Sequence, residues 1–168
     1  MNEQRIGLGV DIHRFAAASG GEVVARELVL GGVAFPGEPV LEGHSDADAI
    51  AHAVADAILG AAGLGDIGTY FPDTDERWRG ADSISLLESC ASSARDLGWR
   101  LVNADCTVVT ERPRLAGARE EMIRRLSGAA GGPVHVKGTR PERLGSLGRI
   151  EGLACVAVAL VERATASI

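Results

Sequence analysis

The sequence has few aromatic residues and no excess of positive charge. Aromatic side chains make up 4% of its 168 residues, and the formal net charge is −6 at pH 7. Surfaces that bind nucleic acid are usually basic and carry aromatic side chains for stacking, so we expect no nucleic-acid partner. Hydrophobic residues reach 46%, enough for a core filled mainly by Ala, Val, Leu and Ile. We therefore expect one compact domain over residues 1–168.

Cysteines and long apolar runs are also scarce. Cys90, Cys106 and Cys155 are odd in number, far apart and without a C-x-x-C pair, which indicates neither a disulfide framework nor a structural zinc site. We expect all three to be small buried side chains. No run of about 18 apolar residues could span a membrane, and the opening MNEQRIGLG has no apolar signal core. We therefore expect a cytoplasmic protein with no membrane partner.

Hydrophobic periodicity predicts a mixture of strands and helices. Strands are expected near 5–13, 28–35, 100–110, 133–139 and 151–162, and helices near 46–61, 82–97 and 115–127. This mixture predicts an α/β or α+β fold in two layers, with helices on one face of a mixed sheet. The last strand is apolar on both faces, so we expect it to be buried within the sheet or at a subunit contact.

The first strand has two chemically different faces. One face, which we expect to pack on the core, carries Ile6, Leu8, Val10 and Ile12. The other face is bare glycine until it ends in Asp11 and His13, about 7 Å apart between Cα atoms. Both side chains can reach one metal ion at that distance. A lone D-x-H pair more often just ends a strand in solvent, so a third ligand is needed to favour a metal site.

The segment HSDADAIAHAVADAILG predicts an amphipathic helix. Ser45 is expected to be its N-cap, in a capping box with Asp48. One stripe of the helix is apolar, and a second stripe nearly opposite carries Asp48, His52 and Asp56. Such a polar stripe usually faces solvent. Together with Asp11 and His13, however, His52 completes a set of two imidazoles and one carboxylate that suits zinc with an open fourth position.

Residues 63–68, GLGDIG, have the letter pattern of a nucleotide-binding loop, but they follow a helix. A dinucleotide fingerprint follows a strand and opens a helix, so this interpretation fails. Gly63 and Gly65 predict a helix end and a tight loop. The irregular stretch that follows carries Asp66, Asp73 and Asp75. These carboxylates either bind sugar hydroxyls or simply form turns.

A basic cluster lies late in the chain. The segment VKGTRPERLGSLGR, residues 136–149, holds Lys137, Arg140, Arg143 and Arg149 against a single acid, Glu142. This concentration of positive charge in an acidic protein predicts a phosphate site. An exposed basic loop without a ligand is the alternative. The segment TERPRLAG, residues 110–117, adds two arginines just after a predicted strand.

Six segments in order cover nearly the whole chain and together carry a family resemblance. They are GVDIH, GHSDADAIAHAVADAILGAAGLGDIGTYFPDTD, GADSISLLE, NADCTVV, ERPRL and RLGSLGRIEGLACVAVALV. The chain resembles the 2-C-methyl-D-erythritol 2,4-cyclodiphosphate synthase family of the non-mevalonate isoprenoid pathway. The resemblance implies a homotrimer whose sheets line a central core, with active sites between adjacent subunits. It also implies a phosphorus–oxygen lyase that cyclises 4-diphosphocytidyl-2-C-methyl-D-erythritol 2-phosphate and releases CMP.

The resemblance also implies roles for particular residues. Zinc would be held by Asp11, His13 and His52, and a second divalent cation, Mg²⁺ or Mn²⁺, by Glu142. His44 and Ser45 would hold the substrate near the reacting phosphate, with Asp11 and His13 beside it. The erythritol pocket would be lined by Asp66, Ile67, Gly68, Phe71, Pro72, Asp73, Thr74 and Asp75. The cytidine diphosphate would be held by Thr110, Glu111, Arg112, Pro113, Arg114, Leu115, Ala116, Thr139, Arg140, Pro141 and Glu142 of the neighbouring subunit.

The chain departs from the family pattern at several positions. GTRPE stands where the family usually has A-T-T-T-E, so Arg140 replaces a threonine at the reacting phosphate. Arginine can still donate to phosphate, so we expect altered detail more than lost activity. Ser146 replaces a phenylalanine near the central cavity, which argues against an isoprenoid diphosphate bound there by Arg149 and Glu151. A trimeric metal- and nucleotide-binding relative without turnover, and a metal-dependent phosphohydrolase, are the alternatives.

Overall fold

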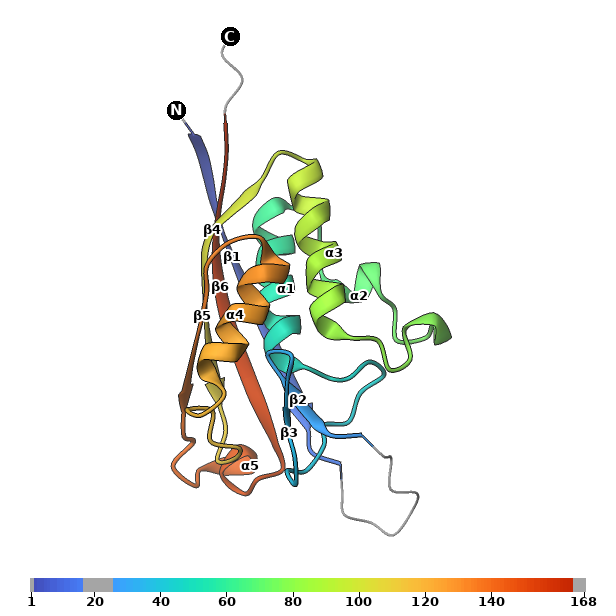
Figure 1. The fold of residues 1–168 in the computed structure, drawn as a ribbon, viewed down its shortest axis with the longest axis vertical. Coiled ribbons are helices and arrows are strands. Elements are labelled where there is room, and N and C mark those ends of the chain that lie inside the picture. Colours follow the sequence, from blue (N-terminus) through green and yellow to red (C-terminus); the bar gives the residue numbers. More distant parts are fainter. Residues whose placement is uncertain (1, 17–25, 165–168) are drawn as a thin grey trace.

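The computed structural model describes residues 2–16 and 26–164, in which a mixed sheet forms one layer and helices cover one of its faces (Figure 1). The strand order is β1 (Asn2–Arg14), β6 (Gly152–Ala164), β4 (Arg100–Val109) and β5 (Val134–Thr139). β6 is antiparallel to both of its neighbours, and β4 is parallel to β5. The main helices are α1 (Ala49–Ala62), α3 (Ser83–Asp96) and α4 (Arg119–Ala130). The predicted two-layer α/β architecture is confirmed.

The shorter elements differ from the prediction. The single strand expected over 28–35 is a hairpin of β2 (Leu28–Leu30) and β3 (Val33–Phe35). Gly31 and Gly32 form its two-residue turn with φ of +58° and +74°, a left-handed pair that glycine adopts without steric cost. Three short helices lie where the sequence analysis placed loops: α2 (Ile67–Tyr70), the 3₁₀ helix η1 (Glu76–Trp78) and α5 (Gly145–Gly148).

The predicted orientation of the first strand is wrong. The glycine face of β1, not its apolar face, packs against the helix layer. A Cβ added to Gly7 would lie 1.9 Å from the carbonyl oxygen of Ala57, and one added to Gly9 would lie 1.9 Å from that of Ala53. Helix α1 therefore rests directly on the strand backbone, because neither partner carries a large side chain there. This close approach sets the position of α1 relative to the end of β1.

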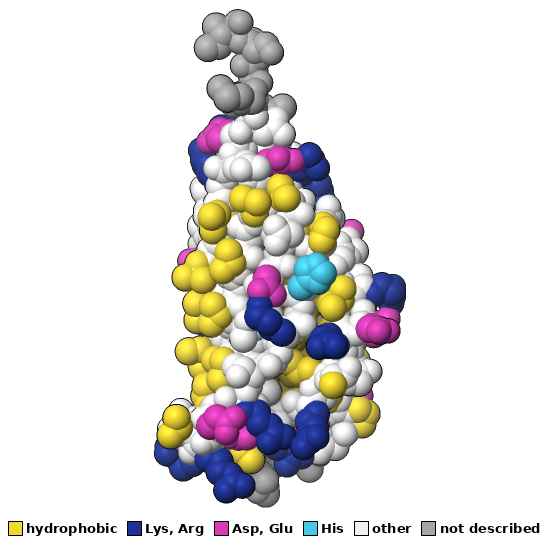
Figure 2. All heavy atoms as spheres, turned by 90° about the vertical axis from the view of Figure 1, so that its left-hand side faces the viewer, with side chains coloured by type: hydrophobic (Ala, Val, Ile, Leu, Met, Phe, Trp, Pro, Cys, Tyr) yellow, Lys and Arg dark blue, Asp and Glu magenta, His cyan; other side chains and the backbone are white. Residues whose placement is uncertain are grey.

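The opposite face of the sheet is apolar and exposed in the single chain. Ile6, Leu8, Val10 and Ile12 of β1 are 73%, 63%, 50% and 68% exposed, and Val156 and Val158 of β6 are 38% and 44% exposed. Figure 2 shows apolar side chains gathered along this face, with basic side chains at the end opposite the chain termini. The last strand is therefore buried on its helix side, whereas Val156 and Val158 on its outer side are partly exposed. The subunit-contact alternative of the sequence analysis stays a prediction.

Helix α1 begins later than predicted, with Asp48 rather than Ser45 as its N-cap. The Asp48 carboxylate accepts hydrogen bonds from the backbone N–H groups of Ile50 and Ala51 at 3.1 and 3.2 Å. It also accepts from Gly31 at 2.8 Å and Gly32 at 2.6 Å, so the β2–β3 turn is fastened to the helix start. Complete burial raises the pKa of Asp48 to about 6, against the lowering effect of these hydrogen bonds. A sequence-based capping rule places the cap three residues early because it does not include the distant turn.

The cysteines and the end of α1 agree with the sequence analysis. Cys90, Cys106 and Cys155 are free and buried, as predicted. Helix α1 ends at Gly63, which has φ of +75°, as the glycine pattern predicted. Across residues 2–16 and 26–164, every helix is too short or too polar to cross a membrane.

Candidate active site

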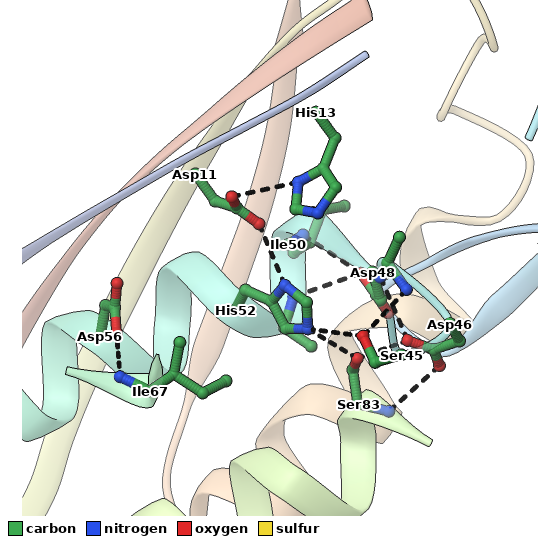
Figure 3. Close-up of polar contacts among 12 residues, drawn as sticks. Asp11, His13, Ser45, Asp46, Asp48, Ile50, His52, Asp56, Ile67 and Ser83 are labelled. Carbon is green, nitrogen blue, oxygen red and sulfur yellow. Dashed lines mark hydrogen bonds and ion pairs between the residues drawn. The ribbon is translucent and has the colours of Figure 1, made fainter. Parts of the chain in front are cut away.

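Three potential metal ligands converge where β1 ends beside the start of α1 (Figure 3). One carboxylate oxygen of Asp11 lies 3.1 Å from Nδ1 of His13, and the other lies 3.1 Å from Nδ1 of His52. One ligand atom from each residue can be chosen so that all lie within 4.8 Å of one another. The structure thus brings together the three residues that the sequence analysis grouped. We call them the Asp11–His13–His52 group.

The electrostatics of this group fit a cation. Burial raises the pKa of Asp11, but hydrogen bonds and charge from the two imidazoles outweigh it and lower the pKa to about 2. Burial lowers the pKa of His52, whereas Asp11 and the nearby Asp48 carboxylate raise it, and the net result lies above 6.5. Nδ1 of His13 is buried, and an Asp11 carboxylate oxygen lies 3.1 Å from it. An ionised carboxylate beside two imidazole nitrogens is a donor set that suits a metal cation.

The far side of His52 contacts Ser45, which the sequence analysis placed near the reacting phosphate, and Ser83, which it missed. Its Nε2 lies 2.8 Å from Oγ of Ser83 and 3.3 Å from Oγ of Ser45. Ser83 is the first residue of α3, is fully buried, and donates its hydroxyl hydrogen to Asp46. The motif GADS predicts a helix start there, but only the packing of α3 beside α1 brings Ser83 to the imidazole.

A cavity of about 440 Å³ opens beside the two imidazoles. Most residues predicted for the reacting phosphate and the erythritol pocket line it, and Trp78 and Leu86 add apolar wall that the sequence analysis missed. Phe71 and Trp78 meet edge to face with ring centroids 4.8 Å apart, which gives one wall a rigid aromatic surface. The predicted residues in its lining are His13, His44, Ser45, His52, Ile67, Gly68, Phe71, Pro72 and Asp73.

Carboxylates near this cavity accept hydrogen bonds that hold the segment after α1 in place. Asp66, predicted on an irregular stretch, is instead the N-cap of α2 and accepts from the Thr69 N–H at 2.9 Å. Asp56 lies one turn after His52 and accepts from the Ile67 N–H at 2.7 Å, which ties the loop to α1. Nε2 of His44 lies 3.0 Å from the backbone oxygen of Asp75. The predicted pocket residues Asp66, Thr74 and Asp75 do not line the cavity itself.

A second cavity, of about 320 Å³, lies between the loop after β4 and the end of β5. It shares no lining residue with the first cavity. Three arginines reach it, which suits a polyanionic ligand. Arg119 and Gly138 are additions that the sequence analysis missed. The predicted residues in its lining are Thr110, Glu111, Pro113, Arg114, Leu115, Ala116, Thr139 and Arg140.

The remaining predicted residues lie outside both cavities. Arg112 instead pairs with Glu38, with Nε 2.5 Å from Oε2. Glu142 and Arg143 adopt φ of +52° and +63°, a strained region for residues with a Cβ that is enriched at functional sites. Glu111 accepts from the Arg143 N–H at 2.7 Å and joins the two loops. The others outside both linings are Pro141, Glu142, Ser146 and Arg149.

Comparison with known proteins decides the family. The YgbB family model matches residues 4–162. The chain belongs to the YgbB family. A curated family relative, 2-C-methyl-D-erythritol 2,4-cyclodiphosphate synthase of Rubrobacter xylanophilus, is 55% identical over 98% of this chain and 98% of its own length. The synthase of the same name from Geobacillus kaustophilus is 51% identical over 95% of this chain and 98% of its own length.

Solved YgbB-like structures share the fold over nearly the whole chain. The Plasmodium falciparum IspF in complex with CDP has a TM-score of 0.80 at 30% identity, covering 98% of this chain and 99% of its own. The bifunctional IspDF of Campylobacter jejuni has a TM-score of 0.88 at 35% identity, and this chain spans 43% of it. The predicted resemblance to the cyclodiphosphate synthase family is confirmed.

Proposed function

We propose that this YgbB chain converts 4-diphosphocytidyl-2-C-methyl-D-erythritol 2-phosphate to 2-C-methyl-D-erythritol 2,4-cyclodiphosphate and releases CMP. The single observation that carries this proposal is the Asp11–His13–His52 group beside a cavity with an aromatic wall, in a chain 55% identical to a curated synthase of that name. A phosphate seated at the histidines and a sugar against the wall would both fit this cavity.

The reaction needs positioning more than a protein nucleophile. An oxygen of the substrate's 2-phosphate attacks the β-phosphorus, and the bond between that phosphorus and the CMP oxygen breaks, so CMP leaves with the bonding electron pair. His44 and Ser45 would hold the substrate near the reacting phosphate. Arg140 would donate to the phosphates where other family members use a threonine. Holding the two reacting groups in line accounts for the acceleration expected of such a site.

Two divalent cations fit this scheme. Zinc would be held by the Asp11–His13–His52 group, and Mg²⁺ or Mn²⁺ by Glu142. When bound, these cations neutralise the charge that accumulates as the phosphates approach each other. The strained φ of Glu142 supports a functional role for its loop.

A homotrimer would complete the active site. The two cavities share no lining residue, which supports assembly of one site from the first cavity of one subunit and the second cavity of the next. The exposed apolar face of β1 and β6 supports subunit contact, since soluble monomers rarely expose so continuous a patch. The acidic chain could then bind a polyanion through its metals and the arginines of the second cavity.

Phosphorus NMR tests the proposed reaction directly. The purified protein is incubated with the diphosphocytidyl substrate, zinc and magnesium, alongside a His52→Ala variant whose folding is checked by circular dichroism. We expect signals of the cyclic diphosphate and CMP only with the unmutated protein. CMP with a linear phosphate would instead indicate a hydrolase, and an unchanged substrate spectrum would indicate a binding protein.

A further inference from the structure

A chain of polar contacts leads away from the metal-facing side of His52 into the protein. Nε2 of His52 lies 2.8 Å from Oγ of Ser83, and this Oγ donates to one carboxylate oxygen of Asp46 (Figure 3). The other oxygen of Asp46 accepts the backbone N–H of Ser83 at 3.0 Å. The same carboxylate also accepts the Asp48 N–H at 3.1 Å. Asp46 thus receives three donors and holds Ser83 from two directions.

The direction of each hydrogen bond follows from counting hydrogens. An ionised carboxylate only accepts, so the hydroxyl hydrogen of Ser83 must point to Asp46. The hydroxyl has one hydrogen, and it therefore has only a lone pair to offer to His52. Nε2 of His52 must then carry the hydrogen and donate it. In the neutral ring, Nδ1 is left with a free lone pair.

The other contact of this ring nitrogen does not reverse the conclusion. Oγ of Ser45 lies 3.3 Å from Nε2, farther than Oγ of Ser83 at 2.8 Å. It accepts the Ala47 N–H at 3.1 Å with one lone pair and has a second lone pair that can accept from Nε2, so the shorter contact with Ser83 decides the direction. On its opposite side, the imidazole faces Asp11, whose carboxylate oxygen lies 3.1 Å from Nδ1. In the Nε2–H tautomer, Nδ1 therefore turns its lone pair toward a carboxylate, and a cation between the two atoms would bind both.

We propose that Ser83 and Asp46 are positioning residues that fix His52 as its Nε2–H tautomer, so that Nδ1 presents a lone pair to the ion held with Asp11 and His13. The proposal rests on the proposed metal site and extends it to the start of α3. Ligating histidines commonly donate their second ring N–H to an oxygen acceptor, which fixes both tautomer and orientation. Here a serine hydroxyl, itself oriented by a carboxylate, takes that place.

The unmutated, metal-free protein provides the first test. Nitrogen NMR of histidine-labelled protein, at a pH well above the pKa of His52, distinguishes the two neutral tautomers. We expect the hydrogen on Nε2. A hydrogen on Nδ1, donated to Asp11, would overturn the proposal. This measurement needs no metal and no variant, so it separates the positioning role from the proposed zinc site.

Metal affinity provides the second test. Ser83→Ala removes the acceptor of the Nε2 hydrogen, and we expect zinc affinity, measured by competition with a chromophoric chelator, to fall about 10- to 100-fold. The histidine tautomer should shift toward Nδ1–H in the same variant. Ser83→Thr keeps a hydroxyl and should restore both signals.

Ser85→Ala is the matched control. Ser85 lies in the same first turn of α3 and its hydroxyl also bonds an aspartate, Asp82, at 2.7 Å, but it is exposed and does not contact His52. We expect unchanged zinc affinity. Equal zinc affinity in the Ser83→Ala and unmutated proteins would overturn the proposal. Failure of the unmutated protein to bind zinc would instead contradict the proposed metal site and leave the tautomer result standing.

Discussion

The two faces of strand β1 differ in burial, although their residues alternate along the same short segment. The inner face is glycine against the backbone of α1 and ends in Asp11 and His13. The outer face is a row of large aliphatic side chains exposed in the single chain. Burial within a chain is set by what the neighbouring element allows, so the more apolar face of a strand need not be the buried one.

The largest expected effect comes from filling the glycine face. Gly9→Val would place side-chain atoms on the carbonyl of Ala53, where even a Cβ lies 1.9 Å away, and backbone atoms cannot yield as a flexible side chain can. We expect the free energy of unfolding to fall by more than about 4 kcal/mol, measured by urea denaturation. Gly60→Ala is the matched control, because its Cβ would come no nearer than 4.0 Å. That helical substitution should be neutral or stabilising by up to about 1 kcal/mol.

A charge on the outer face should act on assembly rather than on the fold. Leu8 is 63% exposed, so we expect Leu8→Asp to change the unfolding free energy of an isolated subunit little. In the proposed trimer the same change would bury three unpaired carboxylates, and we expect sedimentation to show monomers without synthase activity. A Leu8→Asp trimer with normal activity would place the subunit contact elsewhere.

The free energy of unfolding should depend on pH through His52, which lies beside the polar end of the inner face of β1. The sign of this dependence should differ between the metal-free and the zinc-bound protein. The pKa of His52 is raised above 6.5 in the fold, so in the metal-free protein its stabilising contribution is complete below 6.5 and is lost as the pH rises through the folded value. Zinc competes with that proton, so zinc-dependent stabilisation should grow over the same rise. Thermal unfolding with and without zinc checks both slopes, and parallel slopes would contradict a zinc ligand at His52.

The smallest expected effects come from alanine substitutions at two adjacent residues of β6, one on each face of the sheet. Cys155 pairs with Asp11 and is fully buried, whereas Val156 pairs with Val10 and is 38% exposed. We expect Cys155→Ala to cost about 1 kcal/mol through a small cavity. Val156→Ala should cost less than about 0.5 kcal/mol when measured on monomeric protein. The reverse order would mean that the outer face is covered within the chain.

The Asp11–His13–His52 group could be predicted because residue spacing within single strands and helices indicates it. A period of two puts Asp11 and His13 on the same side of a strand, and helical spacing puts His52 on a polar stripe. The contributions of Ser83 and Asp46 could not be predicted. They depend on how α3 packs beside α1, and nothing near either residue in the sequence indicates that contact. The N-cap was misplaced for the same reason, since Asp48 is fastened by the distant Gly31–Gly32 turn.

The amino-acid sequence alone predicted the longer helices and strands, the family and the candidate metal ligands, because periodicity and motif spacing are properties of short segments. Which face of β1 is buried depends on tertiary packing. An alternating pattern specifies two faces but does not assign either to the core. The deciding contact packs Gly7 and Gly9 of β1 against the backbone of Ala57 and Ala53 of α1, residues 50 and 44 positions away in the sequence.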